Sequence, residues 1–129
     1  MIKPMLAADP EMVAEYSEFA INTTDPSSDG RESTFHRNPG YLSALAAEGM
    51  LPLLRERLGV AHLVMSDITT SGPVLGTATH ATDLGFAVTV VEDACWDPSE
   101  QVHRALLDTV LPVLSWVSPS EEAGSYMAG

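Results

Sequence analysis

Two apolar runs of strand length stand out in the second half of the chain. They are Ala61–Met65 (AHLVM) and Phe86–Val91 (FAVTVV), and apolar residues recur at helical spacing over 73–84 and 98–110. A last short strand is expected over 113–117. Alternating strands and helices predict a parallel sheet with right-handed crossovers.

Local signals set the expected helix ends. Pro73 suits a first helical turn, and Gly85 suits a left-handed stop. Asp97 or Ser99 is expected to cap the helix over 98–110. In each helix, the spacing places a set of mostly apolar residues on one face. In the first helix that face holds Val74, Ala78, Ala81 and Gly85, and in the second Val102, Ala105, Leu106, Thr109 and Val113.

The first half of the chain has fewer apolar runs. The pattern predicts an amphipathic helix over 9–20, a long loop over 22–39, and helices over 40–49 and 51–58. Pro52 is expected in the first turn of the last of these. Long loops in compact domains are often functional, so the loop is a candidate for part of a site.

Size and charge narrow the classes of protein. The 129 residues, 45% of them hydrophobic, predict a single domain spanning residues 1–129. A net charge of −12 argues against nucleic-acid partners and anionic membranes, because both need clustered Lys and Arg. The simplest interpretation of the charge is a solvated surface.

Cysteine and histidine usage gives little sign of a metal or a disulfide. Cys95 is the only cysteine, and no Cys/His pairs stand at metal-ligand spacing, so neither a metal nor a cofactor is predicted. A reducing cytoplasm is the simplest location. The chain also lacks a signal-peptide core and an apolar run of the roughly 18 residues needed to span a bilayer.

Several segments together resemble the isochorismatase-like (cysteine hydrolase) family. Residues 67–78 read DITTSGPVLGTA, and residues 83–95 read DLGFAVTVVEDAC. The first is similar to the family block G-V-x-T-x-x-C-V-x-x-T-A, and the second to its later L-G-x-x-V-x-V-V-x-D-A strand. Residues 53–67 and 100–112 look like the elements flanking these blocks. The resemblance implies a three-layer αβα sandwich with a parallel sheet and a site at the carboxyl ends of its strands.

The family's catalytic residues are not matched in this chain. The position of the nucleophilic cysteine falls on Pro73, which has neither a thiol nor the backbone N–H that helps to stabilise an oxyanion. Aligning Ser33–Phe35 with the family's S-A-F-like tripeptide places Asp29 or a neighbour where the lysine belongs. No apolar strand precedes Ile21, so the resemblance implies a shortened member without the first central strand and its aspartate. The family's thiol chemistry is therefore not expected.

A missing central strand would leave the strand 61–65 with unpaired backbone groups. The prediction is a homo-oligomer, or docking onto a longer homologous partner chain that completes the sheet.

Two residues are candidates for proton transfer to a small-molecule substrate. Asp67 follows a strand directly, so it is placed for general acid or base catalysis, although capping the turn is an equal alternative. His36 lies on the long loop, and histidine is the residue type best suited to proton transfer near neutral pH. Ser71 fits an N-cap better than a nucleophile. The predicted substrate-binding residues are Phe35, Arg37, Thr69, Thr70, Ser71, Gly72 and Pro73.

Other notable side chains are interpreted as structural. Cys95 follows a strand and is expected to behave as a small apolar residue. His62, His80 and His103 are expected in structural or interface positions, and Trp96 and Trp116 in the core or an interface.

Three functions remain open. The first is a repurposed biosynthetic enzyme that isomerises, cyclises or eliminates a small organic substrate through Asp67 and His36. The second is an inactive scaffolding subunit for a longer homologue. The third is a hydrolase with another nucleophile. Fold alone does not decide between them.

Overall fold

The computed structural model describes residues 33–128, which contain a three-stranded parallel sheet. Its strands are β1 (His62–Met65), β2 (Ala87–Val91) and β3 (Trp116–Ser118), in the order β1-β2-β3. His62 lies opposite Ala87, and Thr89 lies opposite Trp116. The sequence thus placed two strands to within a residue, because each is a continuous apolar run. Within the described residues, β1 and β3 form the edges of the sheet.

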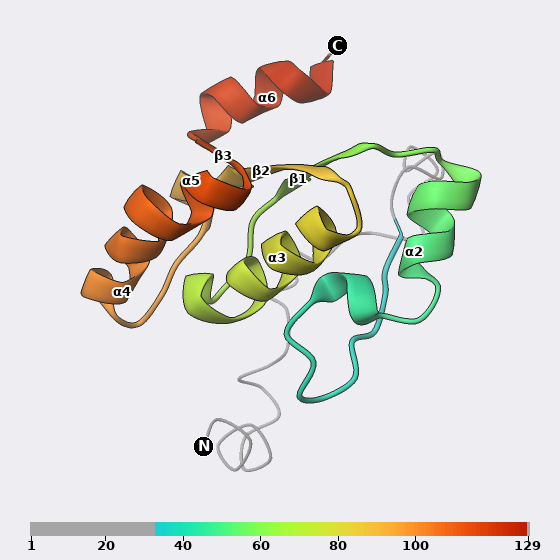
Figure 1. Ribbon diagram of the computed structural model, residues 1–129, viewed down its shortest axis with the longest axis horizontal. Helices are drawn as coiled ribbons and strands as arrows, with labels where there is room; N and C mark the ends of the chain where they lie inside the picture. Colours follow the sequence, from blue (N-terminus) through green and yellow to red (C-terminus); the bar gives the residue numbers. More distant parts are fainter. Residues whose placement is uncertain (1–32, 129) are drawn as a thin grey trace, which may run out of the picture. The chain divides into compact units, whose positions relative to one another are not determined.

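The first crossover helix joins β1 to β2 (Figure 1). A π-helical turn, η4 (Thr70–Val74), leads into α3 (Leu75–Asp83). Val74, Ala78 and Ala81 have no exposed surface, which confirms the predicted face at these three positions, whereas its fourth member, Gly85, is exposed. Gly85 ends the crossover with a φ of 85°, the left-handed stop expected from the sequence.

A longer helical segment joins β2 to β3. After a 3-10 turn, η5 (Glu92–Ala94), it runs through α4 (Glu100–Ala105), a π turn η6 (Leu106–Val110) and α5 (Leu111–Leu114). The Ser99 hydroxyl accepts a hydrogen bond from the Val102 N–H, so Ser99 is the N-cap. The strand predicted over 113–117 begins only at Trp116, because the Ser115 N–H still bonds the Leu111 carbonyl at 2.9 Å.

The buried face of this segment differs from the predicted one. Leu106, Leu107 and Leu111 are buried, whereas Val113 is 83% exposed and Val102 is 40% exposed. The segment carries two apolar stripes, and the leucine stripe offers more apolar surface than one containing Ala105 and Thr109. The prediction for this helix face was wrong, except at Leu106.

The helix predicted over 40–49 is reduced to one 3-10 turn, η2 (Ala44–Ala46). The Ser43 hydroxyl caps this turn. The Ala44 N–H, at the start of the turn, donates to the hydroxyl of Thr77 in α3 at 2.9 Å. Gly49, with a φ of 84°, then turns the chain into the next helix.

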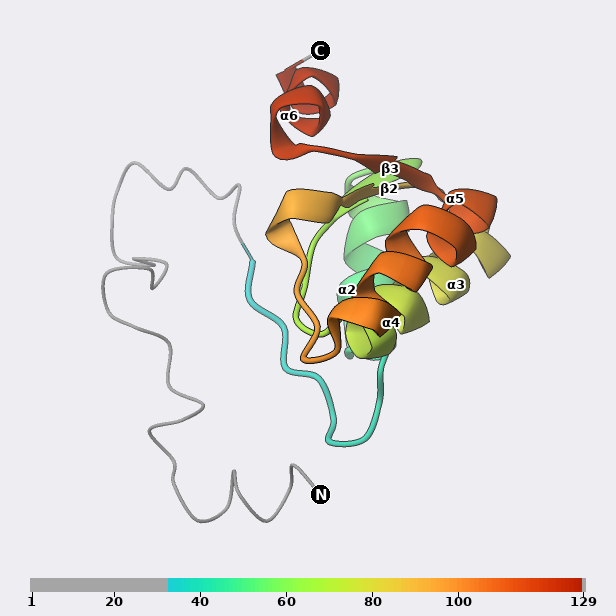
Figure 2. The same cartoon turned by 90° about the vertical axis from the view of Figure 1, so that its left-hand side faces the viewer.

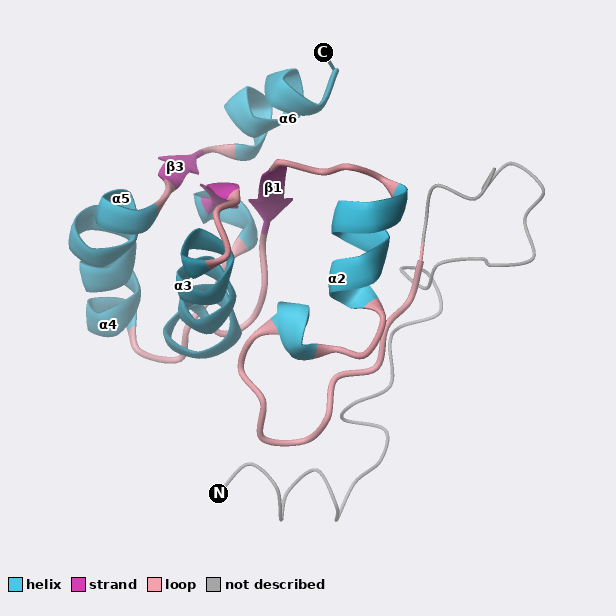
Figure 3. Cartoon of the chain, turned by 45° about the vertical axis from the view of Figure 1, so that its right-hand side comes forward, coloured by secondary structure: helices cyan, strands magenta, loops and turns pink. Residues whose placement is uncertain are grey.

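The helix predicted over 51–58 is present as α2 (Met50–Pro52) continued by a π turn, η3 (Leu53–Arg57), with Pro52 in its first turn as expected. Figure 3 shows it after an irregular segment that includes residues 33–39, the described part of the predicted loop. The helix predicted over 9–20 lies outside the described residues.

Helices lie on both sides of the sheet (Figure 2). Leu63, Val88 and Val90 face the main core, where they meet α3 and the leucines of η6 and α5. The opposite face carries His62, Thr89 and Trp116 and is covered by α6 (Ser120–Ala128). This arrangement confirms the predicted αβα layering with a parallel sheet. No helix within 33–128 is long and apolar enough to cross a membrane.

Candidate functional site

The segments that follow β1 and β2 run side by side at the carboxyl ends of the strands. Ile68 and Trp96 form an isolated parallel bridge, and the Thr70 N–H donates to the Trp96 carbonyl at 2.9 Å. The Ile68–Thr69 peptide is cis. Parallel α/β proteins generally bind ligands at this end of the sheet, so this is the candidate site.

The Cys95 thiol lies beside the backbone of Asp67, on the neighbouring segment. The Asp67 carboxylate is partly buried and accepts a hydrogen bond from the Ile68 N–H at 2.7 Å. Cys95 is buried, and this burial raises the pKa of its thiol. The Asp67 backbone N–H opposes the rise, whereas the charges of Asp67 and Asp93 add to it. The thiol therefore stays protonated near neutral pH.

The sequence interpretation had treated Cys95 as packing only. The signal that could have paired it with Asp67 is that each residue closely follows a parallel strand. Such residues meet at one edge of the sheet when the strands are neighbours.

A network of hydrogen bonds centred on Asp97 holds the polar turn in place. The buried Asp97 carboxylate accepts from the Ser71 N–H at 2.8 Å and from the Ser99 N–H at 3.2 Å. The Ser71 hydroxyl is the main cause that lowers the pKa of Asp97, and the His103 charge contributes in the same direction. Ser71 is thus bound inside the first helical turn, and the N-cap expected from the sequence is not formed.

His103 extends this network to the start of the helix. Its Nδ1 lies 2.8 Å from the hydroxyl oxygen of Thr70, which is fully buried. Sequence reasoning had taken Asp97 only as a possible cap and His103 only as structural. Their partners lie 26 and 33 residues away in the chain, so local patterns held no signal for them.

The remaining predicted residues fall into two groups. Thr69, Gly72 and the buried Pro73 lie in the turn with Ser71, as expected. A groove of about 440 Å³ runs along the start of the helix and is lined by Ser71 and Gly72, with Leu42 and His80 among its other walls. His80 is held there by a 2.8 Å hydrogen bond between its Nδ1 and the Ser43 hydroxyl.

Phe35 and Arg37 contact residues of the segment that precedes α2. The Phe35 ring lies beside Gly49, and Arg37 donates to the Leu42 carbonyl at 2.9 Å. His36 is exposed, and within residues 33–128 no hydrogen bond joins it to Asp67. Its catalytic role stays a prediction. The same residues contain no group of three Asp, Glu, His or Cys side chains arranged to hold a metal ion.

The elements described above define an α/β sandwich with a candidate site at the carboxyl edge of its parallel sheet. The isochorismatase domain model matches residues 15–122, and the chain therefore belongs to the isochorismatase family. An uncharacterised isochorismatase family protein of Escherichia coli O157:H7, YecD, is 33% identical over 72 residues, which are 56% of this chain and 38% of YecD.

Solved structures show the same fold. An isochorismatase family protein from Burkholderia thailandensis matches with a TM-score of 0.62 and 23% identity, over 69% of this chain and 46% of that chain. An isochorismatase family protein from Desulfovibrio vulgaris matches with a TM-score of 0.58 and 22% identity, over 73% of this chain and 53% of that chain. The chain thus spans about half or less of the length of these relatives.

Proposed function

We propose that this protein transforms a small organic molecule by acid–base chemistry, without a thiol nucleophile at the start of the helix after β1. The observation that carries the proposal is that Asp67 and the Cys95 thiol lie close together at the carboxyl ends of β1 and β2. Pro73, at the position where the family resemblance places the nucleophile, is buried and has no N–H.

The two groups have complementary roles in the proposed reaction. The Asp67 carboxylate accepts a proton from a C–H bond of the substrate, and the protonated Cys95 thiol donates one at a second atom. An isomerisation, a cyclisation or an elimination follows, according to where the electron pair moves. The proposal includes return of the proton from Asp67 to the Cys95 thiolate through solvent, which restores the starting state.

The incorporation of solvent isotopes into the product distinguishes this chemistry from hydrolysis. The protein is incubated with fractionated small-molecule extract in D₂O and, separately, in H₂¹⁸O, and the products are measured by mass spectrometry. Acid–base turnover exchanges substrate hydrogen, so deuterium enters the product and ¹⁸O does not. Incorporation of ¹⁸O would instead identify a hydrolase, and no change in any compound would favour a subunit without activity.

A variant pair tests the role of Asp67. We expect Asp67→Asn to lower the rate of deuterium incorporation by about 10²-fold or more, the usual contribution of a general base. Asp108→Asn, an exposed carboxylate on η6, carries the same change of charge and is expected to keep the wild-type rate. Equal rates in both variants would contradict the proposal.

One observation favours a second function, that of a subunit completing a larger sheet. Within the described residues β1 pairs only with β2, so its other side is open. A homologous chain, or a second copy, is suited to pair there.

A further inference from the structure

We propose that the pocket between the sheet and α6 binds a small alkylammonium ion. This pocket has a volume of about 310 Å³ and is lined by His62, Ala87, Thr89, Trp116 and Tyr126. Its aromatic residues come from the first positions of β1 and β3 and from α6, on the sheet face opposite the main core. The proposal is independent of the acid–base function.

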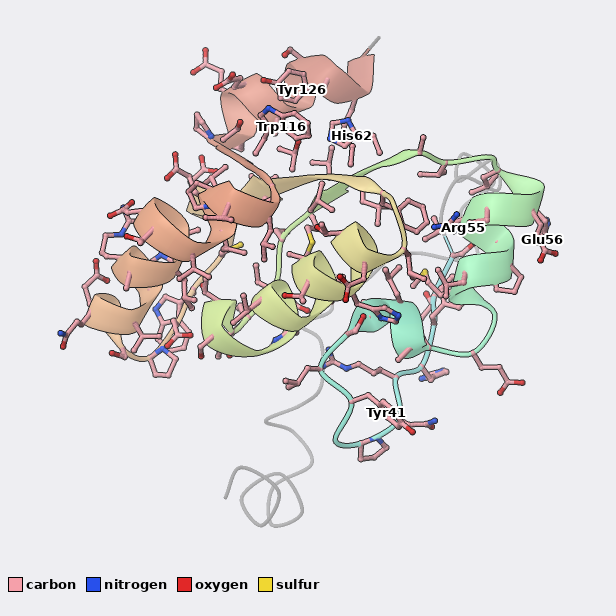
Figure 4. All side chains as sticks on the ribbon, in the orientation of Figure 1. Tyr41, Arg55, Glu56, His62, Trp116 and Tyr126 are labelled. Carbon is pink, nitrogen blue, oxygen red and sulfur yellow. The ribbon has the colours of Figure 1, made fainter. Side chains whose placement is uncertain are left out.

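Three rings form the walls of the pocket, as Figure 4 shows for the labelled side chains His62, Trp116 and Tyr126. The His62 ring centroid lies 6.1 Å from that of Trp116 and 6.5 Å from that of Tyr126. Trp116 is 62% exposed and Tyr126 is 47% exposed, so the rings retain accessible surface. A cation within about 6 Å of several ring centroids is stabilised by their π electrons.

The angles between the rings select the shape of the ligand. The His62 plane is tilted by 47° against Trp116 and by 34° against Tyr126. A flat ligand needs walls that are close to parallel for stacking on both sides. Tilted walls suit a compact, rounded group such as a methylated ammonium, which presents the same charge in every direction.

Hydrogen bonds fix two of the walls before any ligand arrives. The His62 Nε2 lies 2.8 Å from the hydroxyl oxygen of the fully buried Thr89. The Tyr126 hydroxyl donates to Glu122 Oε1 at 2.8 Å. The second bond also holds the Glu122 carboxylate at the hydroxyl of one wall, and its charge complements a cation. Prior fixation lowers the entropy lost on binding.

Choline and its neutral isostere 3,3-dimethylbutan-1-ol test charge and shape separately. The Trp96→Ala variant leaves Trp116 as the only tryptophan, so its fluorescence reports on the pocket. We expect choline to change this fluorescence in a saturable way and the isostere to bind at least tenfold more weakly. Failure of choline to bind, or equal binding of the isostere, overturns the proposal.

Substitutions in the full-length protein locate the binding. Measured by calorimetry, Trp116→Ala is expected to weaken choline binding about tenfold, whereas Trp96→Ala retains it. Glu122→Gln is expected to weaken it severalfold, and Glu121→Gln, the same change one residue earlier, to leave it unchanged. Far-UV circular dichroism verifies that each variant folds. Equal effects of the two glutamate changes would mean that only the net charge of the protein attracts choline, and would overturn the site.

Discussion

At the scale of single residues, Asp97 connects the segments that follow β1 and β2. Its carboxylate accepts backbone hydrogen bonds from Ser71 and Ser99, at 2.8 Å and 3.2 Å. Asp97→Asn keeps the size of the side chain but turns an amide N–H₂ towards one of these donors. We expect a loss of about 2 kcal/mol in the free energy of unfolding at pH 7, measured by urea denaturation.

The lowered pKa of Asp97 also predicts how this loss of stability depends on pH. Because the pKa of Asp97 is lowered in the folded protein, its stabilisation is present above the unfolded pKa of about 3.9. The stabilisation is lost as the pH falls through the folded value. The difference between wild type and Asp97→Asn should therefore shrink below about pH 4. A difference that stays constant down to pH 3 would show that the carboxylate charge is not responsible.

How much of the site the sequence predicts depends on distance along the chain. Asp67 and the turn containing Ser71 lie after β1 as expected, because they follow a recognisable strand, and their role in a site stays a prediction. His103 and Asp97 are missed as partners of this turn, because only the tertiary fold brings them to it. The family resemblance supplied the layers of the fold, which periodicity alone does not give.

At the scale of elements, the long helical segment between β2 and β3 illustrates the limits of periodicity. One stripe contains Val102 and Val113, the other Leu107 and Leu111, and both repeat at helical spacing. The period alone does not decide which stripe is buried, and the stripe with the larger apolar surface is the one that packs in the core. The helix predicted over 40–49 fails for a related reason, because the Ala44 N–H bonds the distant Thr77.

Two side-chain truncations in this segment test which of the two stripes is buried. Leu107 is 2% exposed, so Leu107→Ala is expected to lower the free energy of unfolding by about 3 kcal/mol. Val113 is 83% exposed, so Val113→Ala should change it by less than about 0.5 kcal/mol. Chemical denaturation of both variants provides the comparison. The reverse order would mean that the stripe predicted from sequence is the buried one.

At the scale of the whole molecule, the side of β1 that is left open within residues 33–128 leads to a prediction about association. The Ala87 N–H donates to the Ala61 carbonyl at 2.9 Å, so Ala61 and, two residues on, Leu63 direct their backbone groups to β2. His62 and Val64 then direct theirs to the open side. A paired strand there would satisfy these groups, which an isolated edge leaves to water.

We propose that this edge pairs with a second copy or with a longer homologous chain. Native mass spectrometry of the protein, alone and with cell extract, should show an oligomer or a captured homologue. Val64→Pro removes an outward N–H without breaking a bond to β2, so it should reduce association while circular dichroism shows a folded protein. Each copy carries a net charge of −12, so self-association should strengthen as salt screens the repulsion. A monomeric mass under all these conditions would contradict the pairing, whereas association that salt weakens would indicate a basic partner.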